Sequence, residues 1–179
     1  MSQLLRLTPM PRLAALAFAF LAATVAPASA DVLKVGDRLA ELDSAVDARG
    51  KGFKLKAYRD KWVVVTVGAS WCKPCAKELP TWDKLAAELK GKVTFIAIDI
   101  DEETAAGKKF HQKLKLKNMT LVYMPPNAGA AASYGSDTMP TTFVADGKGV
   151  VRLVRKGFEE GDASGELKKM RDALAKLVK

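Results

Sequence analysis

Residues 62–80 read W-V-V-V-T-V-G-A-S-W-C-K-P-C-A-K-E-L-P, and this stretch decides the fold. Its first six positions are apolar or β-branched without alternation, a pattern typical of a strand that is buried on both faces. Beyond Cys75 the apolar residues recur at helical spacing as far as Lys90, and Gly91 marks the end of the predicted helix. A buried strand therefore leads directly into a helix, and two cysteines stand at the junction.

The flanking sequence repeats this alternation of strands and helices. A strand, a helix, a short strand and a short helix follow, and a strand pair joined by D-G-K-G leads to a C-terminal amphipathic helix. The expected strands are 93–98, 121–123, 141–145 and 150–154. The expected helices are 102–114 and 128–134, and a last helix, capped by Asp162 or Ser164, extends to Val178. Residues 42–46 and 53–55 predict an extra N-terminal β-hairpin. The sequence therefore predicts an α/β fold in which helices cover both faces of a central mixed sheet.

The N-terminal segment has the organisation of a secretory signal peptide. Two arginines and no acidic residue precede an apolar run over residues 13–25, and A-S-A at residues 28–30 provides a cleavage site. The run is shorter than the roughly 20 residues of a membrane-spanning helix. We expect a cleaved signal peptide at residues 1–30, a single domain at residues 31–179 and a periplasmic protein, with an uncleaved anchor as the alternative. No cysteine follows the run, so a lipoprotein is not expected.

Composition and charge exclude several classes of protein. The chain has 179 residues, of which 49% are hydrophobic and 27% charged, and this fits a globular domain rather than a disordered or fibrous chain. Two cysteines are too few for a disulfide scaffold or a four-cysteine zinc site. The net charge is +9, and it falls to +7 without residues 1–30. We interpret the densest basic stretch, residues 108–117, as a solvated face rather than a nucleic-acid surface; weak contact with anionic membrane lipid is the alternative.

Cys72 and Cys75 have the spacing and the position of a redox pair. A helix start leaves backbone N–H groups unpaired and carries a partial positive charge, so a thiol placed there is stabilised as a thiolate. We therefore expect Cys72 to attack disulfides and the more buried Cys75 to resolve the mixed disulfide that forms. Lys73 adds a nearby cation, and Pro74 presets the backbone of the first turn. Both residues are expected to tune the pKa of Cys72, and a solvated Lys73 with little effect on that pKa is the alternative.

The sequence around the cysteines resembles a known superfamily. W-C-K-P-C after V-V-V-T-V, together with M-P-T-T-F-V at residues 139–144, resembles thioredoxin-like proteins over nearly all of residues 31–179. The export signal, the predicted hairpin, C-A-K-E-L-P at residues 75–80 and the stretch from Tyr134 to Pro140 are similar to the TlpA/ResA/DsbE branch of extracytoplasmic thiol-disulfide oxidoreductases. The resemblance implies a thioredoxin-like fold.

The resemblance also implies roles for residues beside the cysteines. Pro140 is expected to be cis and to lie against the disulfide, which leaves the backbone of Met139 free to pair with an extended substrate. Trp71 is expected to be a partly exposed aromatic that contacts partners, and packing is its alternative role.

A third position implied by the resemblance is Glu78, one helical turn after Cys75, where this branch carries an active-site glutamate. Its carboxylate would take the proton that Cys75 loses, and an exposed helix glutamate is the alternative. Thioredoxins carry a buried aspartate at the position of Thr66, so Glu78 would substitute for that base. Many relatives carry tryptophan at the position of Gly68, and its absence is expected to reshape the surface beside Cys72.

Other polar residues receive ordinary structural roles. Four acidic residues are expected to close a strand and to cap the next helix: Asp99, Asp101, Glu102 and Glu103. His111 is the only histidine, so no second histidine is present to complete a metal site with it.

We expect a periplasmic protein-disulfide reductase that acts by exchange at Cys72 and Cys75. The resemblance implies exported clients, apocytochrome c among them, and a membrane thiol donor of electrons. The dithiol is itself the redox group, so no separate cofactor is expected, and the protein is expected to be a monomer. The direction of exchange stays open, because an oxidase or isomerase uses the same residues. Two cysteines at this spacing would also suit a copper-delivery module with two thiolate ligands, or a purely structural disulfide.

Overall fold

The computed structural model describes residues 32–124, 134 and 138–178. The predicted signal peptide, and all but the last residue of the helix predicted over residues 128–134, lie outside the described residues. None of the helices in the described part of the chain is long and apolar enough to cross a membrane.

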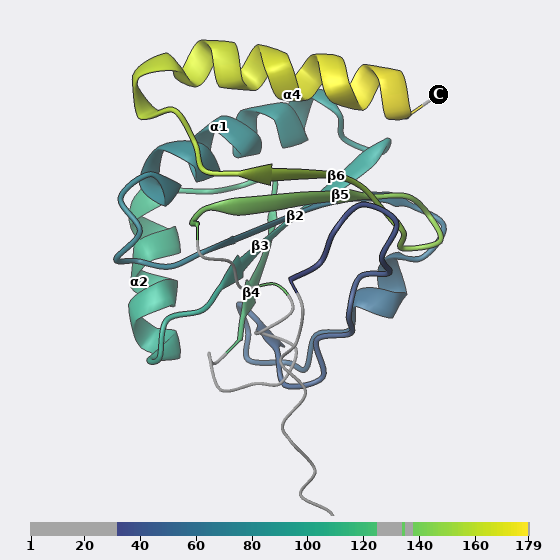
Figure 1. The fold of residues 1–179 in the computed structure, drawn as a ribbon. Helices are drawn as coiled ribbons and strands as arrows, with labels where there is room; N and C mark the ends of the chain where they lie inside the picture. The colour runs from purple at the N-terminus through teal and green to yellow at the C-terminus, as the bar shows by residue number, and fades with distance from the viewer. Residues whose placement is uncertain (1–31, 125–133, 135–137, 179) are drawn as a thin grey trace, which may run out of the picture.

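The described strands form one mixed sheet (Figure 1). It has six strands in the order β1-β4-β3-β2-β5-β6, and β2 pairs parallel with β3 and antiparallel with β5. The bounds are β1 Val46–Asp47, β2 Trp62–Gly68, β3 Val93–Asp99, β4 Thr120–Tyr123, β5 Thr141–Ala145 and β6 Val151–Lys156. The predicted central strand is confirmed, because β2 has a neighbour on each side and every residue from Val63 to Gly68 is buried.

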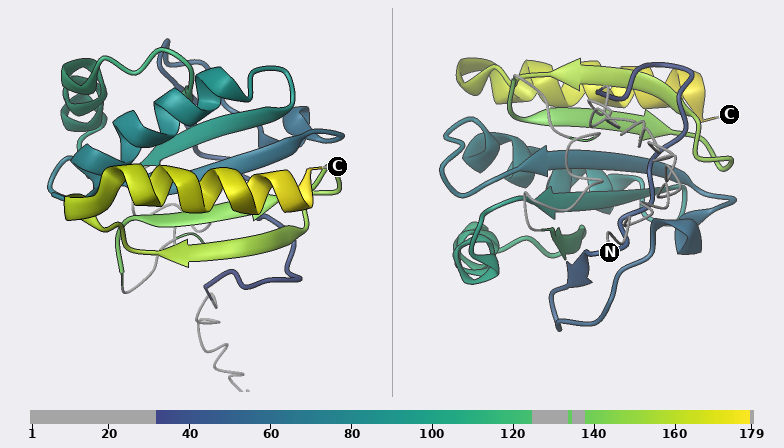
Figure 2. Two further views of the ribbon diagram at one scale, coloured as in Figure 1. Left: turned by 90° about the horizontal axis from the view of Figure 1, so that it is seen from above. Right: turned by 60° about the horizontal axis from the view of Figure 1, so that its bottom comes forward.

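The predicted α/β fold with a mixed sheet is confirmed, and both faces of the sheet are covered. Helices α1 (Cys75–Glu88) and α4 (Ala163–Leu177) pack on one face, and α2 (Thr104–Leu114) contributes partly buried residues to the same core (Figure 2). On the opposite face the described cover is the segment from Leu33 to Tyr58, which ends in the 3-10 helix η1 (Leu55–Tyr58), together with Tyr134. The sheet thus separates two apolar cores.

The predicted N-terminal hairpin is shorter than expected. Residues 42–46 and 53–55 are not two strands: β1 has two residues and pairs with β4, and Val46 forms only an isolated bridge with Gly52. The physical reason is local: the backbone N–H of Ala45 donates to the carbonyl of Leu42 over 3.1 Å in a turn, and Leu55 begins the 3-10 helix η1, so neither segment continues as a strand.

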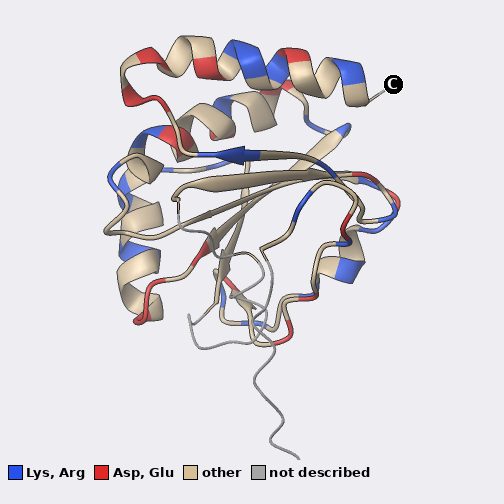
Figure 3. Cartoon of the chain, viewed as in Figure 1, with Lys and Arg blue, Asp and Glu red and all other residues tan. Residues whose placement is uncertain are grey.

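Basic residues are distributed over several elements rather than gathered in one place, as Figure 3 shows.

The helix α4 is held against its surroundings by ion pairs of Arg155 with Glu166 and of Arg171 with Glu88. Asp162 caps this helix, as predicted, by accepting a hydrogen bond from the backbone N–H of Gly165 over 2.9 Å.

Candidate active site

Cys72 and Cys75 form a disulfide where β2 passes into α1. Their Cα atoms are 5.3 Å apart, and the backbone N–H of Cys75, the first residue of α1, donates a hydrogen bond to Sγ of Cys72 over 3.3 Å. Cys75 is fully buried, whereas 5% of Cys72 is exposed. The predicted order of burial is therefore confirmed, and the helix start directs an amide at the outer sulfur.

The residues between and before the cysteines lie at the surface. Trp71 is 66% exposed, which makes it one of two large hydrophobic residues exposed in the described chain. Lys73 is exposed, and Pro74 directly precedes the first residue of α1 with helical φ and ψ of −62° and −31°. Trp71 is therefore available for contact with a partner, and packing does not explain its position.

Glu78 lies inside the protein, one helical turn beyond Cys75. Only 2% of it is exposed, so the alternative of a solvated helix glutamate is wrong. Its Oε2 accepts a hydrogen bond from the hydroxyl of Thr66 over 2.6 Å, and its Oε1 accepts one from the hydroxyl of Thr142 over 2.7 Å. Residues three apart on a helix lie on the same face, so the carboxyl shares the buried face of α1 with Cys75.

Burial raises the pKa of Glu78 from 4.5 to about 7. The hydroxyls of Thr66 and Thr142, the indole of Trp82 and the charge of Arg155 act in the opposite direction, since each stabilises the ionised form. A carboxyl with a pKa near neutrality is able both to accept and to release a proton at physiological pH.

Gly68 makes room for the inner sulfur. A Cβ at this position would lie 2.9 Å from Sγ and 3.2 Å from Cβ of Cys75. The expectation that Gly68 shapes the surface beside Cys72 is therefore wrong: this residue is buried and borders Cys75. The absence of a side chain here lets β2 and α1 approach at the disulfide.

The bond between Met139 and Pro140 is cis, as the resemblance implied. Pro140 is buried, Met139 is half-buried, and β5 begins at the next residue. Because Val67 is paired with Thr141 in the antiparallel ladder, this Met–Pro step lies at the end of β2 that leads to the cysteines.

Three polar residues of the site carry no functional prediction from the sequence. Thr142 donates to Glu78, and Asp101 accepts two hydrogen bonds from Ser70, which is two residues before Cys72. Their signal in the sequence is weak: Thr142 is a polar residue within a buried apolar strand, and Asp101 follows a strand parallel to β2. The carboxyl ends of parallel strands meet at one edge of a sheet, which places Asp101 beside the cysteine loop.

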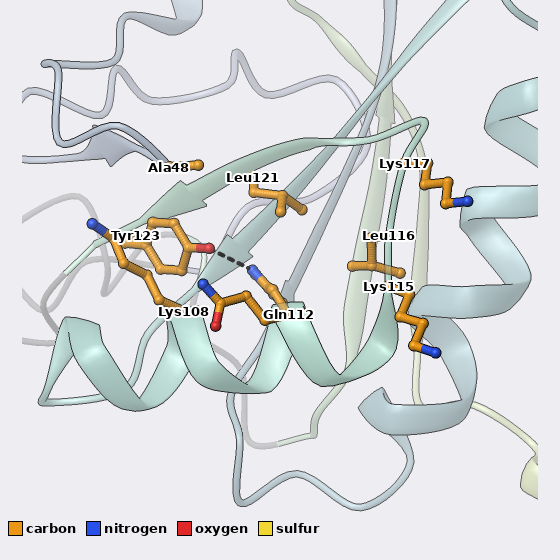
Figure 4. Close-up of a pocket in the computed structure, with 9 residues that line it drawn as sticks. Ala48, Lys108, Gln112, Lys115, Leu116, Lys117, Leu121 and Tyr123 are labelled. Atoms are coloured by element: carbon orange, nitrogen blue, oxygen red, sulfur yellow. Dashed lines mark hydrogen bonds between the residues drawn. The ribbon is translucent and has the colours of Figure 1, made fainter.

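A separate hollow lies between α2 and β4 (Figure 4). It measures about 370 Å³ and contains none of the predicted site residues; Tyr123 and His111 line it, and the hydroxyl of Tyr123 is 3.2 Å from Nδ1 of His111. Burial lowers the pKa of His111 to about 4, so this imidazole is neutral at physiological pH.

Known proteins resemble this chain in sequence. Residues 35–154 match the AhpC/TSA family. The thiol-disulfide oxidoreductase ResA of Bacillus thuringiensis subsp. konkukian (strain 97-27) is 36% identical over 112 residues, which are 62% of this chain and 64% of the relative. ResA of Bacillus anthracis is 35% identical over 127 residues, which are 69% of this chain and 72% of the relative. The chain thus spans slightly less than two thirds of the first of these relatives.

Solved structures agree with the observed fold. A Chlorobium tepidum protein assigned as the thiol:disulfide interchange protein DsbE superposes with a TM-score of 0.68 at 26% identity, over 79% of this chain and 99% of that one. An exposed lipoprotein thioredoxin of Streptococcus pneumoniae superposes with a TM-score of 0.56 at 27% identity, over 73% of this chain and 98% of that one. On the strength of the matched sequence and of a thioredoxin-like fold whose Cys72–Cys75 pair fits a redox-active dithiol, the chain belongs to the AhpC/TSA family.

Proposed function

We propose that the protein is a thiol-disulfide oxidoreductase of the ResA/DsbE type that reduces disulfides in other proteins. The observation that carries this proposal is the Cys72–Cys75 disulfide at the start of α1, with the N–H of Cys75 directed at the outer sulfur. A hydrogen bond and a helix start both favour the thiolate, which is the nucleophile in disulfide exchange.

The reaction runs in two exchanges. The thiolate of Cys72 attacks one sulfur of the client disulfide, so that a mixed disulfide forms and the other client sulfur leaves as a thiolate. Cys75 then loses its proton to the carboxylate of Glu78 and attacks Sγ of Cys72, which releases the second client sulfur as a thiolate. Two electrons pass from the dithiol to the client, and the enzyme is left with the disulfide.

The client would be held beside the dithiol by Trp71, Met139 and Pro140. Trp71 is exposed next to Cys72, and an indole offers a large apolar contact to an unfolded or extended segment. Met139 precedes the cis Pro140 immediately before β5, and its backbone is proposed to pair with the client segment. Lys73 is proposed to favour the thiolate through its charge, and Pro74 through the backbone that it presets.

We propose exported proteins as clients, including apocytochrome c before haem attachment, and the periplasm as the location. This part rests on the signal-like sequence of residues 1–30 and on the resemblance to ResA and DsbE. Reduction consumes the dithiol, so an external thiol donor must regenerate it, and a membrane thiol transporter suits that compartment. The dithiol needs no further cofactor, and we propose a monomer.

Trapping of clients tests the proposal. Cys75→Ala removes the resolving thiol, so the full chain expressed in its host should accumulate mixed disulfides through Cys72. Cys72→Ala is the matched control and should trap none. Clients that are released by reductant and identified by mass spectrometry would name the pathway.

Two outcomes would contradict the proposed function. The first is an absence of mixed disulfides in Cys75→Ala combined with a Cys72 that resists alkylation after reduction, as expected of a structural disulfide. The second is stoichiometric binding of Cu(I) by the reduced wild type without any reductase activity, as expected of a copper-delivery module. A reduction potential well above that of the client disulfides would instead assign the oxidase direction.

A further inference from the structure

The segment between β2 and Cys72 lies at the surface and is closed by a local turn. Ser70 and Trp71 are exposed, and the backbone N–H of Cys72 donates to the carbonyl of Ala69 over 3.0 Å. A turn of this kind fixes the local bend without fixing its place on the molecule. Other parts of the chain must therefore hold the nucleophile in position.

Asp101 provides that hold from the neighbouring strand. It lies two residues after the end of β3 and is buried. Its Oδ2 accepts a hydrogen bond from the backbone N–H of Ser70 over 2.9 Å, and its Oδ1 accepts one from the hydroxyl of Ser70 over 2.9 Å. The two oxygens of one carboxylate thus accept hydrogen bonds from the main chain and from the side chain of one residue. Two such bonds constrain Ser70 more strongly than a single bond does.

Asp101 is in turn held by Asp99. The backbone N–H of Asp101 donates to Oδ1 of Asp99 over 3.1 Å, while Oδ2 of Asp99 has no hydrogen-bond partner within the described chain. Gly107 of α2 gives this carboxyl its space, since a Cβ there would lie 1.9 Å from Oδ1 of Asp99. The strand end that carries Asp101 is thus fixed by a contact of its own.

We propose that Asp101 is a positioning residue for the nucleophile. Through Ser70 it fixes the segment that carries Cys72, and it thereby sets where Sγ of Cys72 lies relative to the N–H of Cys75 and to an incoming disulfide. The inference rests on the proposed thiol-disulfide exchange. Exchange is sensitive to such placement, because displacement of a reacting atom by about 1 Å costs up to roughly a hundredfold in rate.

Alkylation of Cys72 in the reduced protein, followed as a function of pH, tests this role. The profile separates the pKa of Cys72 from the limiting rate constant of its thiolate, and a merely structural residue would not change the latter. Asp101→Asn keeps the shape but cannot accept at both positions, so the limiting rate constant should fall about five- to tenfold. Ser70→Ala retains the main-chain bond and should cause a smaller loss. The double variant should be no slower than Asp101→Asn, because both changes break one connection.

Asp99→Asn is the matched control. It makes the same carboxyl-to-amide change at the same strand end but retains the oxygen that accepts from the N–H of Asp101, so the limiting rate constant should stay within about twofold of wild type. Unfolding in denaturant, measured for every variant, identifies any loss that comes from unfolded protein.

An unchanged limiting rate constant in Asp101→Asn would overturn the proposal. So would losses in Ser70→Ala and Asp101→Asn that multiply in the double variant. Alkylation uses no client, so the readout is separate from the trapping experiment: the trapping of clients tests the proposed function, while the alkylation series decides whether Asp101 places Cys72.

Discussion

The hydroxyl of Thr66 donates a hydrogen bond to Oε2 of Glu78 over 2.6 Å inside the protein. Thr66 lies on β2 and Glu78 on α1, and Thr142 on β5 completes the contact from the other side with a donor to Oε1 over 2.7 Å. The hydroxyl oxygens of the two threonines are 3.1 Å apart. Two strands of the sheet therefore orient one carboxyl and moderate the effect of burial on its pKa. The pKa of Glu78 stays at about 7, so the carboxyl still ionises near neutral pH.

Glu78→Gln should slow the resolving step and leave the first attack by Cys72 unchanged. Glutamine has a similar shape but cannot take the proton of Cys75, and the inflection near pH 7 should disappear from the pH dependence of resolution. Stopped-flow measurement of mixed-disulfide resolution between about pH 5 and 9 checks this. Glu88→Gln, at the exposed end of the same helix, is the control. Resolution kinetics equal to wild type over that range would remove Glu78 from the mechanism.

Thr142→Val should raise the pKa of Glu78 further. The hydroxyl of Thr142 bonds to the carboxyl and lowers its pKa, so its removal should shift the inflection upward by about one pH unit. The same resolution experiment measures the shift. Thr142→Ser retains a hydroxyl and should restore the wild-type position. An inflection that does not move in Thr142→Val would show that the hydroxyl of Thr142 does not lower the pKa of Glu78.

The strands and helices of this domain were largely predictable because apolar periodicity reports local structure directly. Contacts between residues far apart in the sequence could not be predicted from that periodicity. The burial of Glu78 came only from the resemblance to relatives, since its partner Thr142 is 64 residues away and α1 alone does not show which polar residue faces inward. The hydrogen bonds between Ser70 and Asp101 likewise join residues that are 31 apart in the sequence, so local patterns do not predict them. The predicted hairpin was wrong in extent because residues 42–45 form a turn and Leu55 begins a 3-10 helix, and an alternating apolar pattern does not distinguish these short turns from a strand.

Gly68→Ala should destabilise the oxidised protein. The added methyl would lie 2.9 Å from Sγ of Cys75, so β2 or α1 has to shift, and we expect a loss of about 1–3 kcal/mol in the free energy of unfolding. Gly52→Ala is the control, because a Cβ there meets no atom within 4 Å. Denaturant unfolding of both variants measures the difference. Equal effects of the two substitutions would show that the disulfide region accommodates a side chain at Gly68.

The free energy of unfolding should depend on pH through Glu78 in an unusual direction. Its pKa rises from 4.5 in the unfolded chain to about 7 in the folded protein, so between these values the folded protein holds a proton that the unfolded chain has lost. Stability then falls as the pH rises through this window, by up to about 3 kcal/mol in total, and the loss is complete above pH 7. Most paired carboxyls behave in the opposite way, because pairing lowers their pKa.

Comparison of wild type with Glu78→Gln isolates this contribution. Asp99 has its pKa raised to about 7 and adds a slope of the same sign, whereas His111, with its pKa lowered to about 4, loses stability toward acid. Both groups are present in both proteins, so their contributions cancel in the difference. The stability of Glu78→Gln relative to wild type should therefore increase from about pH 4.5 to 7 and then level off, as measured by urea unfolding of the oxidised proteins. If the difference in free energy of unfolding between Glu78→Gln and wild type stays constant across this range, the buried carboxyl titrates at the same pH in the folded and unfolded states. Its surroundings would then be more polar than the two threonine hydroxyls alone make them.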